Sequence, residues 1–146
     1  MNNEAVLAFM AQKIRSRLSA ENPLRERLFA TVAEQKDPQA THTFGVLQTA
    51  KGQAQEIVKG NYTFRIPCRL YAFFYPPEDA AYTADSILGW MQEASLALMQ
   101  VGAEILGKVQ ESFLVLDCVA NGPLHWAPVE EGGWEGSVAF TLTVQF

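Results

Sequence analysis

Apolar residues recur along this chain at two spacings, and each spacing predicts one kind of element. Steps of three and four residues predict a helix over residues 3–19. The same spacing predicts a longer helix that opens at Thr83, a suitable N-cap, with Asp85 in its first turn. Gly102 and Gly107 mark the end of that longer helix. The two apolar stripes contain Val6, Leu7, Met10, Ile14 and Leu18, then Ile87, Trp90 or Met91, Ala94, Leu98, Val101 and Ile105.

Strict alternation of apolar and polar positions predicts strands elsewhere. The clearest strand is 62–74, in which every second residue is apolar. Shorter alternations predict strands over 41–48, 113–120 and 137–146, and residues 24–33 fit a strand better than a helix. These strands make up most of the chain outside the two helices.

Prolines and glycines indicate how the predicted strands are connected. Residues 49–60 have little apolar content and two glycines, which is typical of a polar hairpin connection. A turn is expected at 121–123, and the segment from there to the last strand, which includes His125, Pro128 and 130–133, is expected to be a loop. Pro67 cannot donate a ladder hydrogen bond, so its strand is expected at a sheet edge or to be bulged there.

The order of elements is helix, strands, long helix, strands. This order predicts an α+β fold in which an N-terminal helix and one long helix pack on one face of an antiparallel or mixed sheet. The 146 residues are 49% apolar and 18% charged, which fits one globular domain over 1–146. A domain of this size buries a core without a metal or a disulfide.

The charges are divided unevenly along the chain. The net charge of -5 argues against general binding to nucleic-acid phosphates. Through Arg69 there are ten basic and six acidic residues, whereas from Leu70 onward there is one basic residue and there are ten acidic ones. This split of +4 against -9 suggests that the protein has a partner surface.

The beginning of the chain does not read as a secretory signal, and no apolar run along the sequence approaches the ~18 residues that a membrane span needs. We therefore expect a protein that is made and kept in a cytoplasm. Cys68 and Cys118 each lie within an apolar strand and form no Cys-x-x-Cys pair, so we expect reduced core cysteines.

The residues that could carry catalysis are few. The two histidines, His42 and His125, are expected to be structural residues, and Ser137 lies in no nucleophile elbow. No glycine-rich phosphate loop occurs. We therefore expect no catalytic residues, no cofactor-binding residues and no enzymatic activity.

Two groups of residues have the side-chain types of metal ligands, and the sequence favours a metal at neither. Zinc bound by His42, Cys68, Cys118 and His125 would need ligands from four distant elements without short paired spacing. Oxygen ligands for a divalent cation could come from Glu130, Glu131 and Glu135, but a solvated acidic loop explains them more simply.

The second face of the 62–74 strand carries Arg65, Arg69, Tyr71 and Phe73. Arginine and aromatic residues are enriched at protein interfaces, so these four residues are our hypothesis for a subunit interface. Trp126 and Trp134 have two open interpretations, because each either packs a loop onto the sheet or anchors a protein contact.

Several features occur in a fixed order in this chain. The segment 65–77 ends in Leu-Tyr-Ala-Phe-Phe-Tyr-Pro-Pro, the long helix carries Gly89-Trp90-Met91, and the pre-terminal strand is 113–119. A loop with aromatic and acidic residues follows, and then Gly133-Trp134 leads into the chain-ending strand Ser-Val-Ala-Phe-Thr-Leu-Thr-Val-Gln-Phe. In this order the chain resembles the tail-terminator (tail-completion) proteins of long-tailed bacteriophages.

The resemblance implies a structural virion protein of the tail, assembled in the host cytoplasm. Members of this family form a ring, typically a hexamer, on the finished end of the tail tube, which ends tube polymerisation and provides the surface for head attachment. The implied partners are further copies of this chain, a tail-tube protein and a head-tail connector protein. No sequence-specific nucleic acid, membrane or cofactor is implied. A ring needs two different complementary patches, which basic and acidic halves of one chain would supply.

Alternative functions remain open at this point. One is another head-tail joining or neck component of similar size. Another is a small-ligand-binding α+β domain with a cleft between the long helix and the sheet, in which Cys68, Cys118 or His125 would be the polar groups. Nucleic-acid binding has only the basic first half in its favour.

Overall fold

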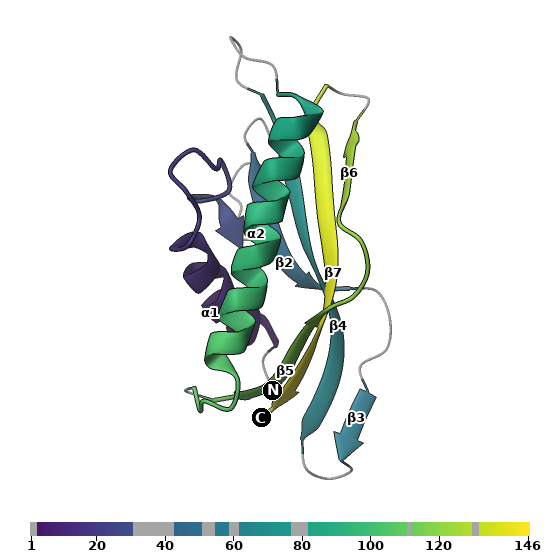
Figure 1. Ribbon diagram of the computed structural model, residues 1–146. Helices are drawn as coiled ribbons and strands as arrows, with labels where there is room; N and C mark the ends of the chain where they lie inside the picture. Colours follow the sequence, from purple (N-terminus) through teal and green to yellow (C-terminus); the bar gives the residue numbers. More distant parts are fainter. Residues whose placement is uncertain are drawn as a thin grey trace.

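Two helices pack on one face of a seven-stranded mixed sheet in the computed structural model of the chain (Figure 1). The structure describes residues 3–30, 43–50, 55–58, 62–76, 82–110, 112–129 and 132–146, and of 55–58 it describes the backbone. The predicted α+β class, with an N-terminal helix and one long helix, is confirmed.

The elements follow one another in the predicted order of helix, strands, helix and strands. They are α1 (Asn3–Arg15), β1 (Leu28–Phe29), β2 (Phe44–Thr49), β3 (Gln55–Val58), β4 (Thr63–Phe74), α2 (Ala84–Ile105), β5 (Leu114–Ala120), β6 (His125–Pro128) and β7 (Trp134–Gln145).

The two longest strands, β4 and β7, form the centre of the sheet. The strand order is β1-β2-β4-β7-β5, while β3 pairs with β4 and β6 pairs with β7. The β1–β2 pair is parallel and all the other pairs are antiparallel. β5 and β6 follow one another along the outer side of β7, which pairs with β4 on its other side.

The long helix α2 covers the apolar face of the sheet. Thr83 caps it as predicted, because its side-chain oxygen accepts a hydrogen bond from the Ser86 N–H at 3.1 Å. The predicted stripe is buried, and complete burial of a side chain such as Leu98 contributes roughly 1.5–3 kcal/mol. Gly102 does not end the helix. It lies buried within α2, where a Cβ would come within 2.7 Å of Cys118 Sγ, so glycine allows the close approach of β5.

The first helix is shorter than predicted, and the segment after it is tied to α2. α1 ends at Arg15, and an ion pair joins Arg17 to Glu104 of α2. The buried Asn22 donates through Nδ2 to the Trp90 carbonyl at 3.2 Å. These contacts place residues 17–22 against α2 and make the two helices one layer.

The prediction that Pro67 lies in an edge strand or at a bulge is wrong, because β4 lies between β2 and β7 and its register on β7 is continuous through Pro67. Pro67 accepts a hydrogen bond from the Ala50 N–H at 2.8 Å, so its nitrogen also faces the β2 side. On that side β2 ends opposite Cys68 and β3 starts opposite Arg65. The ring nitrogen thus lies where the ladder changes from one strand to the next, a position at which a missing donor is tolerated.

Three predicted segments differ in the structure. Within 24–33, the strand is limited to β1 among the described residues, and His42 of the predicted 41–48 strand lies outside them. The expected hairpin connection 49–60 contains β3, and β6 occupies what was expected to be a loop. Both short strands complete the sheet by pairing with the long central strands.

Candidate interface on the open face of the sheet

The sheet has one face that neither helix covers (Figure 1), called here the open face. Alternate residues of β4 point toward this face, and they include all four residues predicted as a subunit interface. Arg65 and Arg69 are exposed, whereas Tyr71 and Phe73 are half-buried. The structure therefore places Arg65, Arg69, Tyr71 and Phe73 on one face of one strand, as alternation requires.

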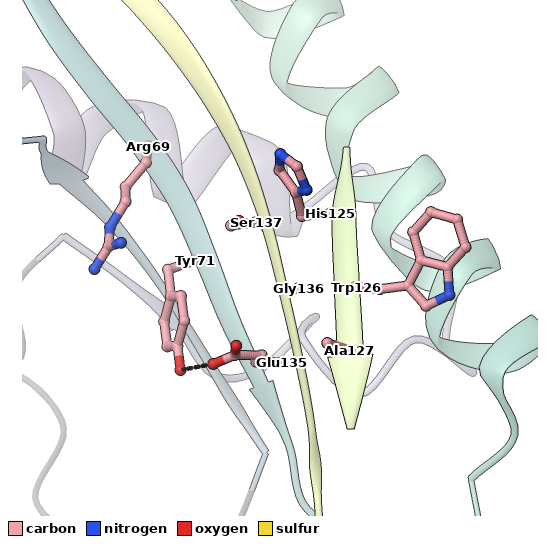
Figure 2. Close-up of a pocket in the computed structure, with 8 residues that line it drawn as sticks. All are labelled: Arg69, Tyr71, His125, Trp126, Ala127, Glu135, Gly136 and Ser137. Carbon is pink, nitrogen blue, oxygen red and sulfur yellow. Dashed lines mark hydrogen bonds between the residues drawn. The ribbon is translucent and has the colours of Figure 1, made fainter. Parts of the chain in front are cut away.

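Arg69 and Tyr71 are linked to both neighbouring strands. With its amide oxygen turned toward Arg69, Gln48 of β2 accepts from Nε and Nη2 at 2.7 and 2.8 Å. The Arg69 guanidinium carbon lies 5.1 Å from the centre of the Tyr71 ring, a cation–π contact. Tyr71 then donates through its hydroxyl to Glu135 Oε2 of β7 at 3.2 Å, as Figure 2 shows. A chain of four side chains thus crosses three strands.

Tyr71 is held in its protonated form. Burial and the negative charge of Glu135 raise the pKa of Tyr71, and the hydrogen bond to Glu135 acts in the same direction. The nearby Arg69 opposes this shift with a smaller effect. The hydroxyl must keep its proton in order to donate a hydrogen bond to Glu135. Near neutral pH Tyr71 therefore acts as a hydrogen-bond donor and does not release its proton.

Phe73 belongs to an aromatic cluster at one end of the open face. Its ring stacks on Phe44 with centroids 6.2 Å apart and lies 5.9 Å from Tyr75. Gly133 packs so closely that a Cβ there would come within 2.9 Å of Phe73 Cζ. The aromatic side chain is therefore fixed by its own chain, and its half-exposed surface is presented in one orientation.

A shallow depression of about 170 Å³ lies beside Tyr71, where β4, β6 and β7 meet (Figure 2). It is lined by Arg69, Tyr71, His125, Trp126, Ala127, Glu135, Gly136 and Ser137. His125 and Ser137 are opposite each other in the β6–β7 register, yet in the described chain no hydrogen bond joins their side chains.

The two cysteines lie on the other face of the sheet, in the core. Burial and, second, the nearby Cys118 raise the pKa of the Cys68 thiol to about 12. Burial and the charge of Asp117 raise the pKa of Cys118 to about 11. Both thiols are free and protonated at neutral pH, which makes them poor nucleophiles and poor metal ligands. His125 lies on the open face, so the polar groups of the expected ligand cleft do not converge.

The remaining predicted sites have different outcomes. Trp134 packs against the core, whereas Trp126 on β6 is 40% exposed. His42, Glu130 and Glu131 lie outside the described residues. Among the residues that are described, no cluster of three or more His, Cys, Asp or Glu side chains could hold a metal ion. A search of the same residues finds no helix suited to cross a membrane.

The charge split of the sequence is a split in space along the sheet but not in the helix layer. Residues 3–30 and β2, called here the basic flank, carry five basic and three acidic side chains. The acidic flank, formed by the described residues of 82–146, carries one basic and five acidic side chains. α1 contacts β1 and β2, whereas α2 contacts β5, β6 and β7, so within the sheet the flanks lie toward opposite ends with β4 between them. In the helix layer they meet, because α1 contacts α2 and Arg17 pairs with Glu104.

Sequence reasoning missed the partners that fix the interface residues. Gln48 and Glu135 contact Arg69 and Tyr71 only because of the register of β2 and β7 on β4. The sequence carries no direct signal for that register. The strand character of β6 was also missed, although this short extended segment follows Pro123 and ends at Pro128.

Comparisons with known proteins give one informative result. A scan of family models and a search of curated proteins both found no match. Among solved structures, the chain is similar to one described as "Virion of native gene transfer agent (GTA) particle", with a TM-score of 0.54 and 16% sequence identity. The alignment covers 100% of each chain. The whole chain therefore shares its fold with a protein of a virion particle.

Proposed function

We propose that this chain is a structural, non-enzymatic component of a phage-like virion, and that it acts as a tail terminator. In this role several copies form a ring, typically of six, on the finished end of a tail tube. The ring ends tube polymerisation and offers a surface to a head-tail connector protein. The protein would be assembled in the host cytoplasm and retained in the virion tail.

The placement of the charges is the observation that carries this proposal. A closed ring needs head-to-tail contacts, in which one patch of a subunit meets a different patch of the next. Along the sheet the basic and acidic flanks lie toward opposite ends of the strand order, so the two ends of the sheet can present different signs to the two neighbours. Complementary charges of this kind favour the correct pairing and disfavour contacts between like flanks.

The open face supports the same proposal. Arg65 and Arg69 project from it without a helix above them, and Arg69 and Tyr71 are held in place by contacts within the chain. Side chains that are already ordered lose less conformational entropy when a partner binds. We therefore assign Arg65, Arg69, Tyr71 and Phe73 to a subunit interface of the ring.

Two further observations agree with a structural role. The fold is shared with a protein of a gene transfer agent particle, which favours a virion protein over other classes of protein. The order of the aromatic strand end, the long helix and the chain-ending strand resembles that of tail terminators. The expected partners are further copies of this chain, a tail-tube protein and a head-tail connector protein.

The test uses tail-tube protein that is polymerising in solution. Addition of the full chain should place a ring at tube ends, seen by electron microscopy, and should stop tube elongation. The double variant Arg65→Glu with Arg69→Glu should lose both effects while keeping the fold, because both side chains are exposed. Tubes that continue to grow with the wild-type chain present, and that carry no density at their ends, would contradict the proposal.

A further inference from the structure

The depression on the open face is lined by polar side chains whose hydrogen-bonding capacity is only partly used. Its volume of about 170 Å³ is below the ~300 Å³ at which small-molecule pockets begin, so it has room for the end of one side chain and not for a cofactor. Ser137 of β7 is opposite Tyr71 of β4 and also opposite His125 of β6. Figure 2 shows the small Ser137 side chain between the two rings, where it forms the floor of the depression.

Glu135 provides the negative charge of the depression. Its carboxylate is half-buried, and Oε2 accepts from the Tyr71 hydroxyl at 3.2 Å. This hydroxyl is a neutral donor, so it leaves the charge of Glu135 in place. Glu104 is neutralised by its ion pair with Arg17, whereas no lysine or arginine among the described residues forms an ion pair with Glu135. Glu135 therefore keeps one oxygen and its full charge for a further partner.

The nearby Arg69 does not neutralise this carboxylate. Its Nε and Nη2 donate to the amide oxygen of Gln48, and its guanidinium carbon lies 5.1 Å from the centre of the Tyr71 ring. In Figure 2 the guanidinium group is directed away from Ser137, and Tyr71 lies between it and Glu135. The charge of Glu135 raises the pKa of Tyr71 more than the charge of Arg69 lowers it. The negative charge therefore dominates at the end of the depression where Glu135 lies.

The unused groups around the depression can all accept a hydrogen bond. They are Glu135 Oε1, the Ser137 hydroxyl and a ring nitrogen of His125, and none of them has a hydrogen-bond partner in the part of the chain that the structure describes. A cation with several donors would satisfy these acceptors and neutralise Glu135. Arginine has five N–H donors in one plane, stacks on aromatic rings and is enriched at protein interfaces. A guanidinium group thus matches a shallow site between two rings.

Among the arginines of the basic flank, Arg25 is the one best placed to meet a partner. Arg17 is paired with Glu104, Arg27 donates to a backbone carbonyl at 2.9 Å, and Arg15 is only half-exposed. Arg25 is exposed, and its side chain has no hydrogen-bond or ion-pair partner among the described residues. It precedes β1 at one end of the strand order, whereas the depression lies on β4, β6 and β7.

We propose that the depression binds the guanidinium group of Arg25 from a second copy of this chain. The inference rests on the proposed ring and names one pair of residues across its subunit contact, Arg25 with Glu135. Because the two surfaces are different, the contact is head to tail, as a closed ring requires.

Conservative substitutions in the full chain test this pair. Glu135→Gln removes the charge but keeps an acceptor for Tyr71, and Arg25→Gln removes the cation. Each should weaken self-association about tenfold. The double variant should be no weaker than either single variant, because both substitutions remove the same contact. Sedimentation over a range of concentrations gives the association constants, and circular dichroism confirms that each variant is folded.

Asp117→Asn is the matched control for the loss of one negative charge. Asp117 is an exposed residue of β5 that does not line the depression. Its substitution should weaken self-association by less than about twofold, because it acts through general charge alone. An equal loss in Asp117→Asn and Glu135→Gln would overturn the inference, and so would losses that add up in the double variant.

A photo-crosslinking side chain at position 127, which lines the depression, tests the partner surface independently. Crosslinks from one copy into residues 17–27 of another copy are expected. Crosslinks that reach only other parts of the second copy would overturn the inference. In that case, and in the two cases above, the ring proposal stands and the pair of residues is wrong. A chain that stays monomeric at every concentration would overturn both.

Discussion

The two faces of the central strands β4 and β7 are built in different ways. On the helix side, Leu70, Ala72, Phe74 and Phe140 are fully buried beneath α1 and α2. On the open face, the same strands carry side chains that contact each other laterally, such as Arg69 with Tyr71 and Tyr71 with Glu135. Burial is worth roughly 1.5–3 kcal/mol per large side chain, whereas a cross-strand pair is worth roughly 0.2–1 kcal/mol.

The helix side therefore determines most of the stability of the sheet, whereas the open face determines its surface chemistry. The helix side holds the fold together, so its residues tolerate little change. The open face contributes less to the fold, so its arginine and aromatic side chains can be changed with a smaller loss of stability. Substitutions on the two faces should therefore have different consequences, and the following predictions begin with the largest.

The largest loss is expected from a cavity on the helix side. Phe140→Ala removes a side chain that is 0% exposed on β7, and such substitutions cost about 3–5 kcal/mol of unfolding free energy. Urea denaturation followed by circular dichroism measures the change. A loss below about 1 kcal/mol would mean that the site collapses onto the cavity and that the core is less tightly packed than the structure indicates.

A smaller loss is expected from overpacking on the same side. In Gly136→Ala the new methyl group would lie 2.7 Å from Met91 Cγ and 2.8 Å from Met91 Sδ, which should cost about 1–3 kcal/mol. The double variant with Met91→Ala should be more stable than the sum of the two single effects predicts. Strict additivity of the two substitutions would show that Gly136 and Met91 are not in contact.

Alkaline pH should weaken the helix side through its two thiols. Because the folded state raises the pKa of Cys68 from 9.0 to about 12 and that of Cys118 to about 11, it binds these protons more tightly than the unfolded chain does. This stability is fully present below pH 9.0 and is lost as the pH rises through the folded values, by at most about 1.4 kcal/mol per pH unit and thiol. Urea unfolding across this range should show a shallower slope in Cys68→Ala. An unchanged slope would refute the assignment of this pH dependence to Cys68.

The smallest effect on stability is expected on the open face. Tyr71→Phe removes the hydroxyl that donates to Glu135, and a hydrogen bond of this kind contributes about 0.5–1.5 kcal/mol. Partial exposure of both groups favours the lower end of that range. Glu135→Gln keeps an acceptor and should change stability less than Tyr71→Phe does. A loss as large as that of Phe140→Ala would contradict the distinction between the two faces.

The long elements could be predicted because their periodicity extends over many residues. The alternation in 62–74 and the stripe of α2 each repeat often enough to identify strand and helix, and Thr83 marks the start of α2. β3 and β6 have four residues each, too few for a period to stand out. In β6 all four residues are exposed, so no apolar alternation exists to be found.

The candidate site was predictable in part for a related reason. Alternation alone places Arg65, Arg69, Tyr71 and Phe73 on one face of β4. Their partners Gln48 and Glu135 lie on strands distant in the sequence, and only the register brings them together. Pro67 misled the placement of its strand, because the sequence does not reveal that two different strands succeed one another along the same side of β4.

The central claim is that copies of this chain assemble through unlike surfaces into a closed ring. Light scattering coupled to size separation, over a range of protein concentrations, measures this most directly. We predict one closed species with a mass near six times the 16.2 kDa of the chain, which loses mass as added salt screens the charged flanks. A mass of 16.2 kDa at every concentration would contradict the claim, and so would a mass that keeps growing without closure.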